Sequence, residues 1–459
     1  MKRVCLILFL LFLFLSAAAG TTLDDYIRQG LDNNLALKQQ EFSLQKSLEA
    51  LAEAKGLFFP AVSLEARYSR AGGGRIIDVP VGDMLNPVYK SLNDLFRLHG
   101  ISTDFPTDVP NMVFPFFRTR EQDTKLRLVQ PVFQPAIFYN YQVRSNLSKM
   151  DQVQFQAFKR QLVTDIKTAY YTYLKALGVK EVLDQTRLLL EENLQVSESL
   201  FKNGKATEDV VFRAKAEMAG LAEKMAEAEK NRTQAAAYFN FLVNRPLSEP
   251  IQAPLEETPL EKETRDLSDA VRNALAHRDE FAQLMYAQKA VSQQVKLARS
   301  SYWPTLIAVL DYGIQGEKYS FKKDDDYWMF SLVMQWNLFN GGQDRAKAAQ
   351  AMLEHQKLQV QQNELEKQVE LQVTVEFQAL KAAGLALDAA VQKEQSARSA
   401  FEIAAKKYQY GAAPQVEYLD ARTTYTGASV SRVISRCDYL IQQARLEGAA
   451  AWCDLNRYR

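Results

Sequence analysis

The residues whose types and spacing most suggest chemistry are two acidic side chains, Glu417 and Asp420. Being three positions apart, they share one face of a helix. Taken alone, such a carboxylate pair usually forms a solvated helix face. The histidines stand far apart, at positions 99, 277 and 355, and no Ser/His/Asp order, zinc-ligand spacing or phosphate-binding loop accompanies them. The sequence therefore predicts no catalytic residue, no metal site and no cofactor.

The composition is that of a globular chain with long uninterrupted elements. The 459 residues contain 56 Lys+Arg against 55 Asp+Glu, and 47% are hydrophobic, which excludes a disordered chain. The near-zero net charge argues against nucleic-acid binding. Only 14 Pro and 19 Gly interrupt the chain.

The first 20 residues are typical of a secretory signal peptide. Lys2 and Arg3 precede an apolar run at 4–15, and small residues follow at 16–20. This run is shorter than the roughly 20 residues that a membrane-spanning helix needs. No later stretch approaches that length, so the exported chain is either soluble outside the cytoplasm or crosses a membrane as β-strands. Cys437 and Cys453 lie too far apart on one straight helix for a disulfide, at about 24 Å.

The chain is a tandem duplication. Leu23, Ile27 and Leu31 recur 244 positions later as Leu267, Val271 and Leu275, and further matches follow at offsets of 206 and 207. A fixed register over such lengths predicts two structural repeats, at 21–265 and 266–459. The first repeat carries a long insertion at about 70–123.

Each repeat is predicted to contain a helix, two strands, a very long helix, a turn and a further helix. The first repeat has helices at 23–56, 136–203 and 207–243, strands at about 61–69 and 124–134, and a proline-rich linker at 244–265. The second repeat has helices at 267–300, 343–410 and 415–451 and strands at about 303–313 and 326–339. A helix over 136–203 would be about 100 Å long, longer than an ordinary globular core.

The strands alternate apolar and polar residues. Val62, Leu64 and Tyr68 would lie on one face, and Glu65 and Arg67 on the other. This alternation, with Trp residues at 303, 328 and 336, is typical of outer-membrane strands; a water-soluble sheet covering a core shares it. Four strands cannot close a barrel, and an open edge is not viable in lipid. Three chains would supply 12 strands.

Proline and glycine mark the strand–helix junctions. Pro60 and Pro304 begin strands, where a missing N–H is tolerated. Pro135 and the pair Gly341-Gly342 lead into the two long helices.

Three duplicated or ordered motifs, together with this layout, resemble the outer-membrane efflux protein (TolC) family. The motifs are Phe58 to Leu64 with its copy Tyr302 to Leu306, Trp336 to Gly342, and Tyr408 to Ala421. The resemblance extends over nearly the whole chain after residue 20.

The resemblance implies a fold that is mainly α with a small β part. Three chains would form a 12-stranded outer-membrane β-barrel continued by a periplasmic 12-helix α-barrel. The implied function is a passive exit duct of a tripartite efflux or type I secretion system. The duct would lie in the outer membrane of a Gram-negative-type cell and extend into the periplasm. Its implied partners are a periplasmic adaptor (membrane fusion) protein, an inner-membrane pump of RND, ABC or MFS type, and outer-membrane lipid, but no nucleic acid.

The resemblance also implies roles for individual residues. Glu417 and Asp420 would form an acidic ring at the pore constriction, and Tyr408 would be a gate residue. Gly204 and Gly411, which end the two long helices, would lie at entrance tips that contact the adaptor; without the resemblance these segments are plain helical hairpins. In the family's best-known member an arginine that helps close the entrance occupies the position of Ala413.

Two points stay open at this stage. The insertion at about 70–123, in which a short helix is predicted around Val88–His99, either narrows or shields the exit or is a plain surface loop. The competing functions are a periplasmic coiled-coil adaptor or scaffold protein without a channel, and an outer-membrane enzyme on a small barrel. The first would lack lipid-facing strands, and the second would show a catalytic Ser or His on a strand.

Overall fold

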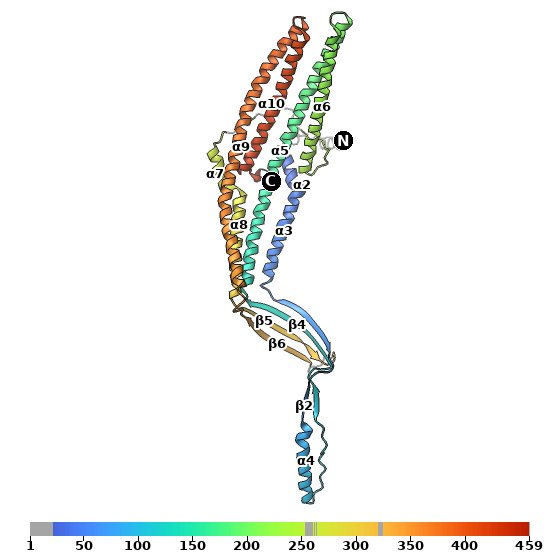
Figure 1. Cartoon of the computed structure of the whole chain (residues 1–459), viewed down its shortest axis with the longest axis vertical. Helices are drawn as coiled ribbons and strands as arrows, with labels where there is room; N and C mark the ends of the chain where they lie inside the picture. Colours follow the sequence, from blue (N-terminus) through green and yellow to red (C-terminus); the bar gives the residue numbers. More distant parts are fainter. Residues whose placement is uncertain (1–21, 253–259, 261, 263, 320–324, 459) are drawn as a thin grey trace, which may run out of the picture. The chain divides into compact units, whose positions relative to one another are not determined.

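The computed structural model describes residues 22–252, 260, 262, 264–319 and 325–458, so the predicted signal peptide at 1–20 and part of the predicted linker lie outside the described residues. The first repeat contains α2 (Leu23–Asn33), α3 (Leu35–Gly56), β1 (Ala61–Arg70), β2 (Ile76–Val79), α4 (Val81–Leu98), β3 (Met112–Pro115), β4 (Arg120–Phe133), α5 (Pro135–Lys202) and α6 (Glu208–Leu242). The second contains α7 (Leu267–His277), α8 (Asp279–Arg299), β5 (Thr305–Gly316), β6 (Asp326–Gln335), α9 (Gln343–Gln409) and α10 (Gln415–Ala449). Figure 1 shows these elements in chain order.

The first helix of each repeat is broken, and the prediction of continuous helices over 23–56 and 267–300 was wrong at these points. Asn34 has an extended backbone, and its side-chain oxygen accepts the Leu37 N–H at 2.8 Å, which caps α3. The same side chain donates to the Leu242 carbonyl at 2.7 Å. Arg278 makes the corresponding break between α7 and α8. The breaks lie at matching places in the two repeats.

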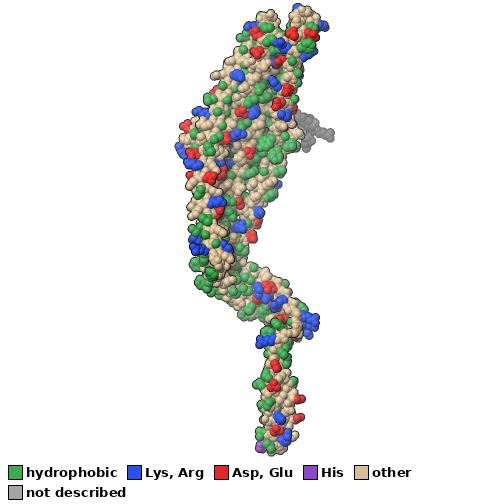
Figure 2. All heavy atoms as spheres, viewed as in Figure 1, with side chains coloured by type: hydrophobic (Ala, Val, Ile, Leu, Met, Phe, Trp, Pro, Cys, Tyr) green, Lys and Arg blue, Asp and Glu red, His purple; other side chains and the backbone are tan. Residues whose placement is uncertain are grey.

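The described chain divides into two compact units. One is helical and comprises the chain up to Ala50, Val143–Ser292 and the chain from Met352 onwards. The other comprises Leu51–Gln142 and Gln293–Ala351 and carries the strands. Figure 2 shows the side chains of both by type.

In the helical unit, α5 of the first repeat packs antiparallel against α10 of the second. Polar contacts follow this seam, and residue numbers fall on α10 as they rise on α5: Lys167 with Glu447 at 2.7 Å, Lys175 with Asp438 at 2.9 Å, and Thr186 with Thr426 at 3.2 Å. Glycines let the helices approach closely. A Cβ at Gly178 would lie 2.7 Å from a Val433 methyl group, and one at Gly448 would lie 2.7 Å from the Thr164 hydroxyl. The seam therefore joins the two repeats.

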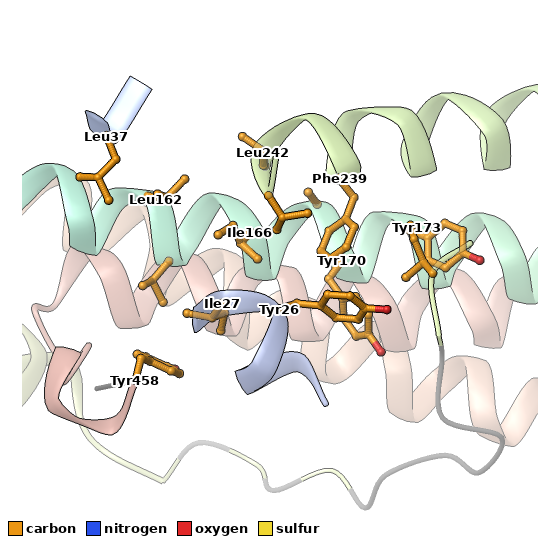
Figure 3. Close-up of a cluster of buried hydrophobic side chains, with 14 residues drawn as sticks. Tyr26, Ile27, Leu37, Leu162, Ile166, Tyr170, Tyr173, Phe239, Leu242 and Tyr458 are labelled. Atoms are coloured by element: carbon orange, nitrogen blue, oxygen red, sulfur yellow. The ribbon is translucent and has the colours of Figure 1, made fainter. Parts of the chain in front are cut away.

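Each repeat has its own hydrophobic core within this unit. Tyr26, Tyr170 and Phe239 meet from α2, α5 and α6, with ring centroids 5.1 to 6.1 Å apart (Figure 3). Burial raises the pKa of Tyr170 to about 12. The second core is built from smaller residues, including Ala270 and Ala274 of α7. Cys437 and Cys453 are not joined by a disulfide.

In the strand-bearing unit, four strands form one antiparallel sheet in the order β1-β4-β5-β6. The β4–β5 pairing joins the two repeats, and among the described residues β1 and β6 each pair along one side only. One face is apolar and exposed: Leu64 is 73% and Trp328 72% exposed. On the opposite face the Arg127 guanidinium donates to both Asp311 carboxylate oxygens at 2.8 Å and also pairs with Glu65.

The insertion between β1 and β4 is folded. The structure has α4 starting seven residues before the predicted helix at 88–99, and β2 pairs with β3 in a separate two-stranded sheet. We call residues 71–119 the arm. None of the helices in the described part of the chain is long and apolar enough to cross a membrane.

Candidate gate and pore site

The two long helices end in the same way, at the glycines predicted as tips. Gly204 and Gly411 adopt φ of 68° and 70°, a left-handed conformation that glycine adopts without strain. The Gly204 N–H donates to the Phe201 carbonyl at 2.9 Å, and the next N–H donates to that of Leu200 at 2.9 Å. Gly411 and Ala412 repeat these bonds at 3.0 and 2.8 Å. The bonds satisfy the last helical carbonyls and turn the chain into α6 and α10.

The predicted acidic pair begins α10. Glu417 and Asp420 are both exposed and lie on the same side of the helix. The Glu417 carboxylate pairs with the Lys407 ammonium at 3.4 Å, across the turn. Near the tip, α10 therefore carries an exposed acidic stripe that one lysine partly compensates.

Tyr408, the predicted gate residue, packs inwards onto α10. Its ring stacks on that of Tyr418, with centroids 5.1 Å apart. Its hydroxyl is buried and has no hydrogen-bond partner among the described residues. Burial also raises the pKa of Tyr418. Ala413, between these rings in sequence, is half-buried and offers no polar side-chain group.

A buried amide, which the sequence analysis missed, connects the two helical hairpins. Gln415 donates to the Asn193 side-chain oxygen at 3.3 Å, the Ser197 hydroxyl at 3.0 Å and the Val210 carbonyl at 3.2 Å. Asn193 and Ser197 continue the buried stripe of α5 that contains Leu190. Polar residues at the spacing of a buried apolar stripe are the signal that would have marked Asn193 and Ser197 as buried.

A second polar contact lies about two turns further along α10. The Arg422 side chain is only 5% exposed, and its guanidinium pairs with Glu217 of α6 at 2.6 Å. It also donates to the Thr423 hydroxyl at 2.9 Å. Gln415 and Arg422 thus tie the α9–α10 hairpin to the α5–α6 hairpin of the same chain. We call these two contacts the hairpin lock.

The predicted junction residues lie between strands and helices. Pro60 and Pro304 each precede the first residue of a strand, and Pro135 is the first residue of α5. Gly341 and Gly342 both have positive φ, 56° and 81°, directly before α9. Within the described ranges, no group of three His, Cys, Asp or Glu side chains is arranged to hold a metal ion.

Comparisons with known proteins agree with this architecture. Residues 270–451 match the model of the outer membrane efflux protein family. The chain is 22% identical to the outer membrane protein TolC of Escherichia coli (strain K12), over 95% of this chain and 83% of that protein. It is 23% identical to TolC of Salmonella enteritidis, over 72% of this chain and 69% of that protein.

Solved structures share the fold. The Campylobacter jejuni CmeC outer membrane channel matches with a TM-score of 0.77 at 16% identity, over 93% of this chain and 85% of that chain. The open state of the Neisseria gonorrhoeae MtrE outer membrane channel matches with a TM-score of 0.70 at 16% identity, over 93% and 88%.

The chain therefore has the fold of these outer membrane channels, mainly helical with a small sheet. Residues 270–451 match the model of the outer membrane efflux protein family, which confirms the resemblance that the sequence predicted. The solved relatives are named as outer membrane channels and not as enzymes.

Proposed function

We propose that three copies of this chain form a passive exit duct through the outer membrane, which serves a tripartite efflux or type I secretion system. The observation that carries the proposal is the four-stranded sheet. It has one exposed apolar face, one charged face and two edge strands that, within the described residues, pair on one side only. Lipid would cover the apolar face, and β6 of one chain would pair with β1 of the next, which removes the open edges. Three sheets give 12 strands, an even number as in other bacterial outer-membrane barrels.

The long helical hairpins would extend into the periplasm. Helices of 68 and 67 residues are each about 100 Å long at 1.5 Å per residue. Their tips, which contain Gly204 and Gly411, would contact a periplasmic adaptor protein coupled to an inner-membrane pump of RND, ABC or MFS type. In this proposal the duct is passive and the pump supplies the energy.

The hairpin lock is our candidate for what holds the entrance closed within each chain. With Ala413 at the position of the arginine implied by the resemblance, that side chain forms no closing bond. Gln415 and Arg422 supply polar contacts between the two hairpins instead. Because these are a few discrete bonds at the end of long hairpins, loosening them would let α9 and α10 swing as one element.

Glu417 and Asp420 are our candidates for the constriction. Three chains would present six carboxylates around one axis, and a ring of like charge in a narrow pore raises the local cation concentration. In this arrangement Tyr408 and Tyr418 form an aromatic support behind the acidic stripe.

The decisive experiment is to fractionate cells that express the full chain and to measure the mass of the detergent-solubilised protein. We expect the protein in the outer membrane, as a trimer that heating in detergent converts to monomers. A monomer released into the soluble fraction would overturn the proposal and favour a periplasmic scaffold.

A further inference from the structure

One side of α4 is covered by the part of the arm that returns after the helix. Asn86 exchanges two hydrogen bonds with the backbone of Val109, at 2.9 and 3.0 Å, and Asn93 does the same with Phe105. The Tyr89 ring stacks on Phe105 at 5.7 Å. These contacts hold the returning segment 103–111 along one side of α4.

The opposite face of α4 is apolar and uncovered. Met84, Val88, Leu95 and Leu98 are 68%, 52%, 52% and 84% exposed, and Ser91 is exposed between them. We call these five residues the arm stripe. At 100° per residue, the arm stripe lies roughly opposite Asn86 and Asn93 on the helix. Apolar side chains are visible along the arm in Figure 2.

The spacing of the arm stripe suits burial against other helices. Its steps of 4, 3, 4 and 3 residues are those of the core positions of a heptad repeat, which buries a helix against other helices in parallel. A helix lying on lipid has an apolar stripe with similar steps, so the choice of further helices rests on the proposed trimer. The repeat has only two heptads, too short to associate as a free peptide, so the partners must be held nearby.

The proposed duct brings such partners together. A 12-stranded barrel with strands about 4.8 Å apart and tilted by about 40° has a diameter of about 24 Å. Each arm would therefore start about 12 Å from the threefold axis, close to the diameter of one helix with its side chains. The arms emerge from equivalent places on one rim, which gives them an effective concentration on the order of millimolar.

We propose that the arms of the three chains associate through the arm stripe into a short parallel three-helix bundle beyond the end of the barrel. This inference rests on the proposed trimeric duct. The bundle would leave solutes to exit between the bases of the arms. The occupant of the arm stripe is thus two further copies of this chain.

Cysteine cross-linking of the full chain tests this. In a background where Cys437 and Cys453 are replaced by alanine, Ser91→Cys places a thiol in the arm stripe. Lys90→Cys is the matched control, because it is the adjacent exposed residue and points away from the arm stripe. The trimer mass of each variant is measured before oxidation or treatment with a short bis-maleimide.

For Ser91→Cys we expect a covalent dimer on a denaturing gel, because three thiols can be linked only in pairs, and dilution should not reduce its yield. Lys90→Cys should remain mostly monomeric. Adding Leu95→Asp to Ser91→Cys should lower the dimer yield at least several-fold while the trimer persists.

The outcomes separate the two proposals. An intact trimer in which residues 90 and 91 cross-link equally, or not at all, overturns the bundle and leaves the duct. Protection of the thiol at 91 only when lipopolysaccharide vesicles are added makes the arm stripe a lipid-binding surface and also overturns the bundle. Absence of a trimer overturns the proposed duct.

Discussion

The two hairpin ends share a backbone but differ in their side chains. Both long helices end at a left-handed glycine with the same pair of hydrogen bonds, and both following helices have 35 residues. At positions 207 apart, however, Glu208 of the first end corresponds to Gln415 of the second, and Arg213 corresponds to Asp420. Duplication conserved the turn and left the faces of the following helix to diverge.

The side chains at the start of α6 and of α10 differ because the two helices pack against different surroundings. The first turns of α6 are largely exposed, and Lys215 pairs with Glu198 at 3.7 Å with both side chains about half exposed. At the equivalent place on α10, Arg422 is buried against α6. At the second end, α10 is therefore held against α6 of the first end. The exposed acidic stripe lies on α10.

The largest predicted effect comes from the ion pair that distinguishes the two ends. Glu217→Leu removes the carboxylate and leaves the Arg422 guanidinium buried without a counterion, which should destabilise the contact by about 3 kcal/mol. The matched change Glu198→Leu removes a half-exposed pair and should cost about 0–1 kcal/mol. Hydrogen–deuterium exchange of peptides from the start of α6 and α10 measures the loss of local stability in each variant.

A rescue variant shows whether the buried charge is the cause. Adding Arg422→Met to Glu217→Leu replaces the uncompensated charge by an apolar side chain and should restore most of the lost protection. An equal loss of hydrogen-exchange protection in Glu217→Leu and Glu198→Leu would mean that the two pairs stabilise their ends equally. That result would contradict the difference between the two ends.

The next effect concerns the buried amide. Gln415→Ala leaves the buried Asn193 side-chain oxygen without its Gln415 donor, at a cost of about 1–3 kcal/mol. If the amide holds the hairpins together, single-channel conductance in planar bilayers should rise. Glu208→Ala, at the equivalent exposed position, should change stability by no more than about 0.5 kcal/mol. An unchanged conductance in Gln415→Ala would show that this residue does not hold the two hairpins together at the entrance.

Much of the architecture could be predicted because it follows from the spacing of apolar residues and from the glycines and prolines that end helices and strands. The duplication, the alternating strands and the long helices are visible as repeated spacings, and the stops at Gly204 and Gly411 follow from glycine's access to positive φ. The break at Asn34 was missed although asparagine is a good capping residue. Its second bond, to Leu242, joins residues 208 positions apart, and no local pattern indicates it.

The site was less predictable because its contacts cross between the repeats. Gln415 meets Asn193 and Ser197 over more than 200 positions, and with one sequence nothing pairs them. Tyr408 was predicted as a gate residue from the resemblance alone; its stacking on Tyr418 depends on the packing of α9 against α10. Local spacing placed Glu417 and Asp420 on one face, which needs only the helical repeat.

A smaller effect tests what the two ends share. Gly204→Ala and Gly411→Ala each force a Cβ into the left-handed region, which costs about 1–2 kcal/mol. Apart from the two adjacent residues, no atom of the described residues lies within 4 Å of either new Cβ, so the cost is confined to the local backbone. We expect equal loss of protection at the Lys205 and Ala412 amides, measured by hydrogen exchange. A clear inequality would show that the two turns are not equivalent.

The smallest effect concerns the charge that only the second end carries. Glu417→Gln with Asp420→Asn removes six carboxylates from a trimer and leaves Lys407 uncompensated, so the potassium-to-chloride permeability ratio should fall several-fold, about 1 kcal/mol. Glu208→Gln with Asp209→Asn removes the same charge from the first end and should leave the ratio nearly unchanged. Reversal potentials in a KCl gradient give both ratios. The difference between the two permeability ratios should shrink in 1 M salt, where the screening length is about 3 Å. If the ratio fell equally in both variants, the selectivity would come from the net charge of the tips and not from a ring at the second end.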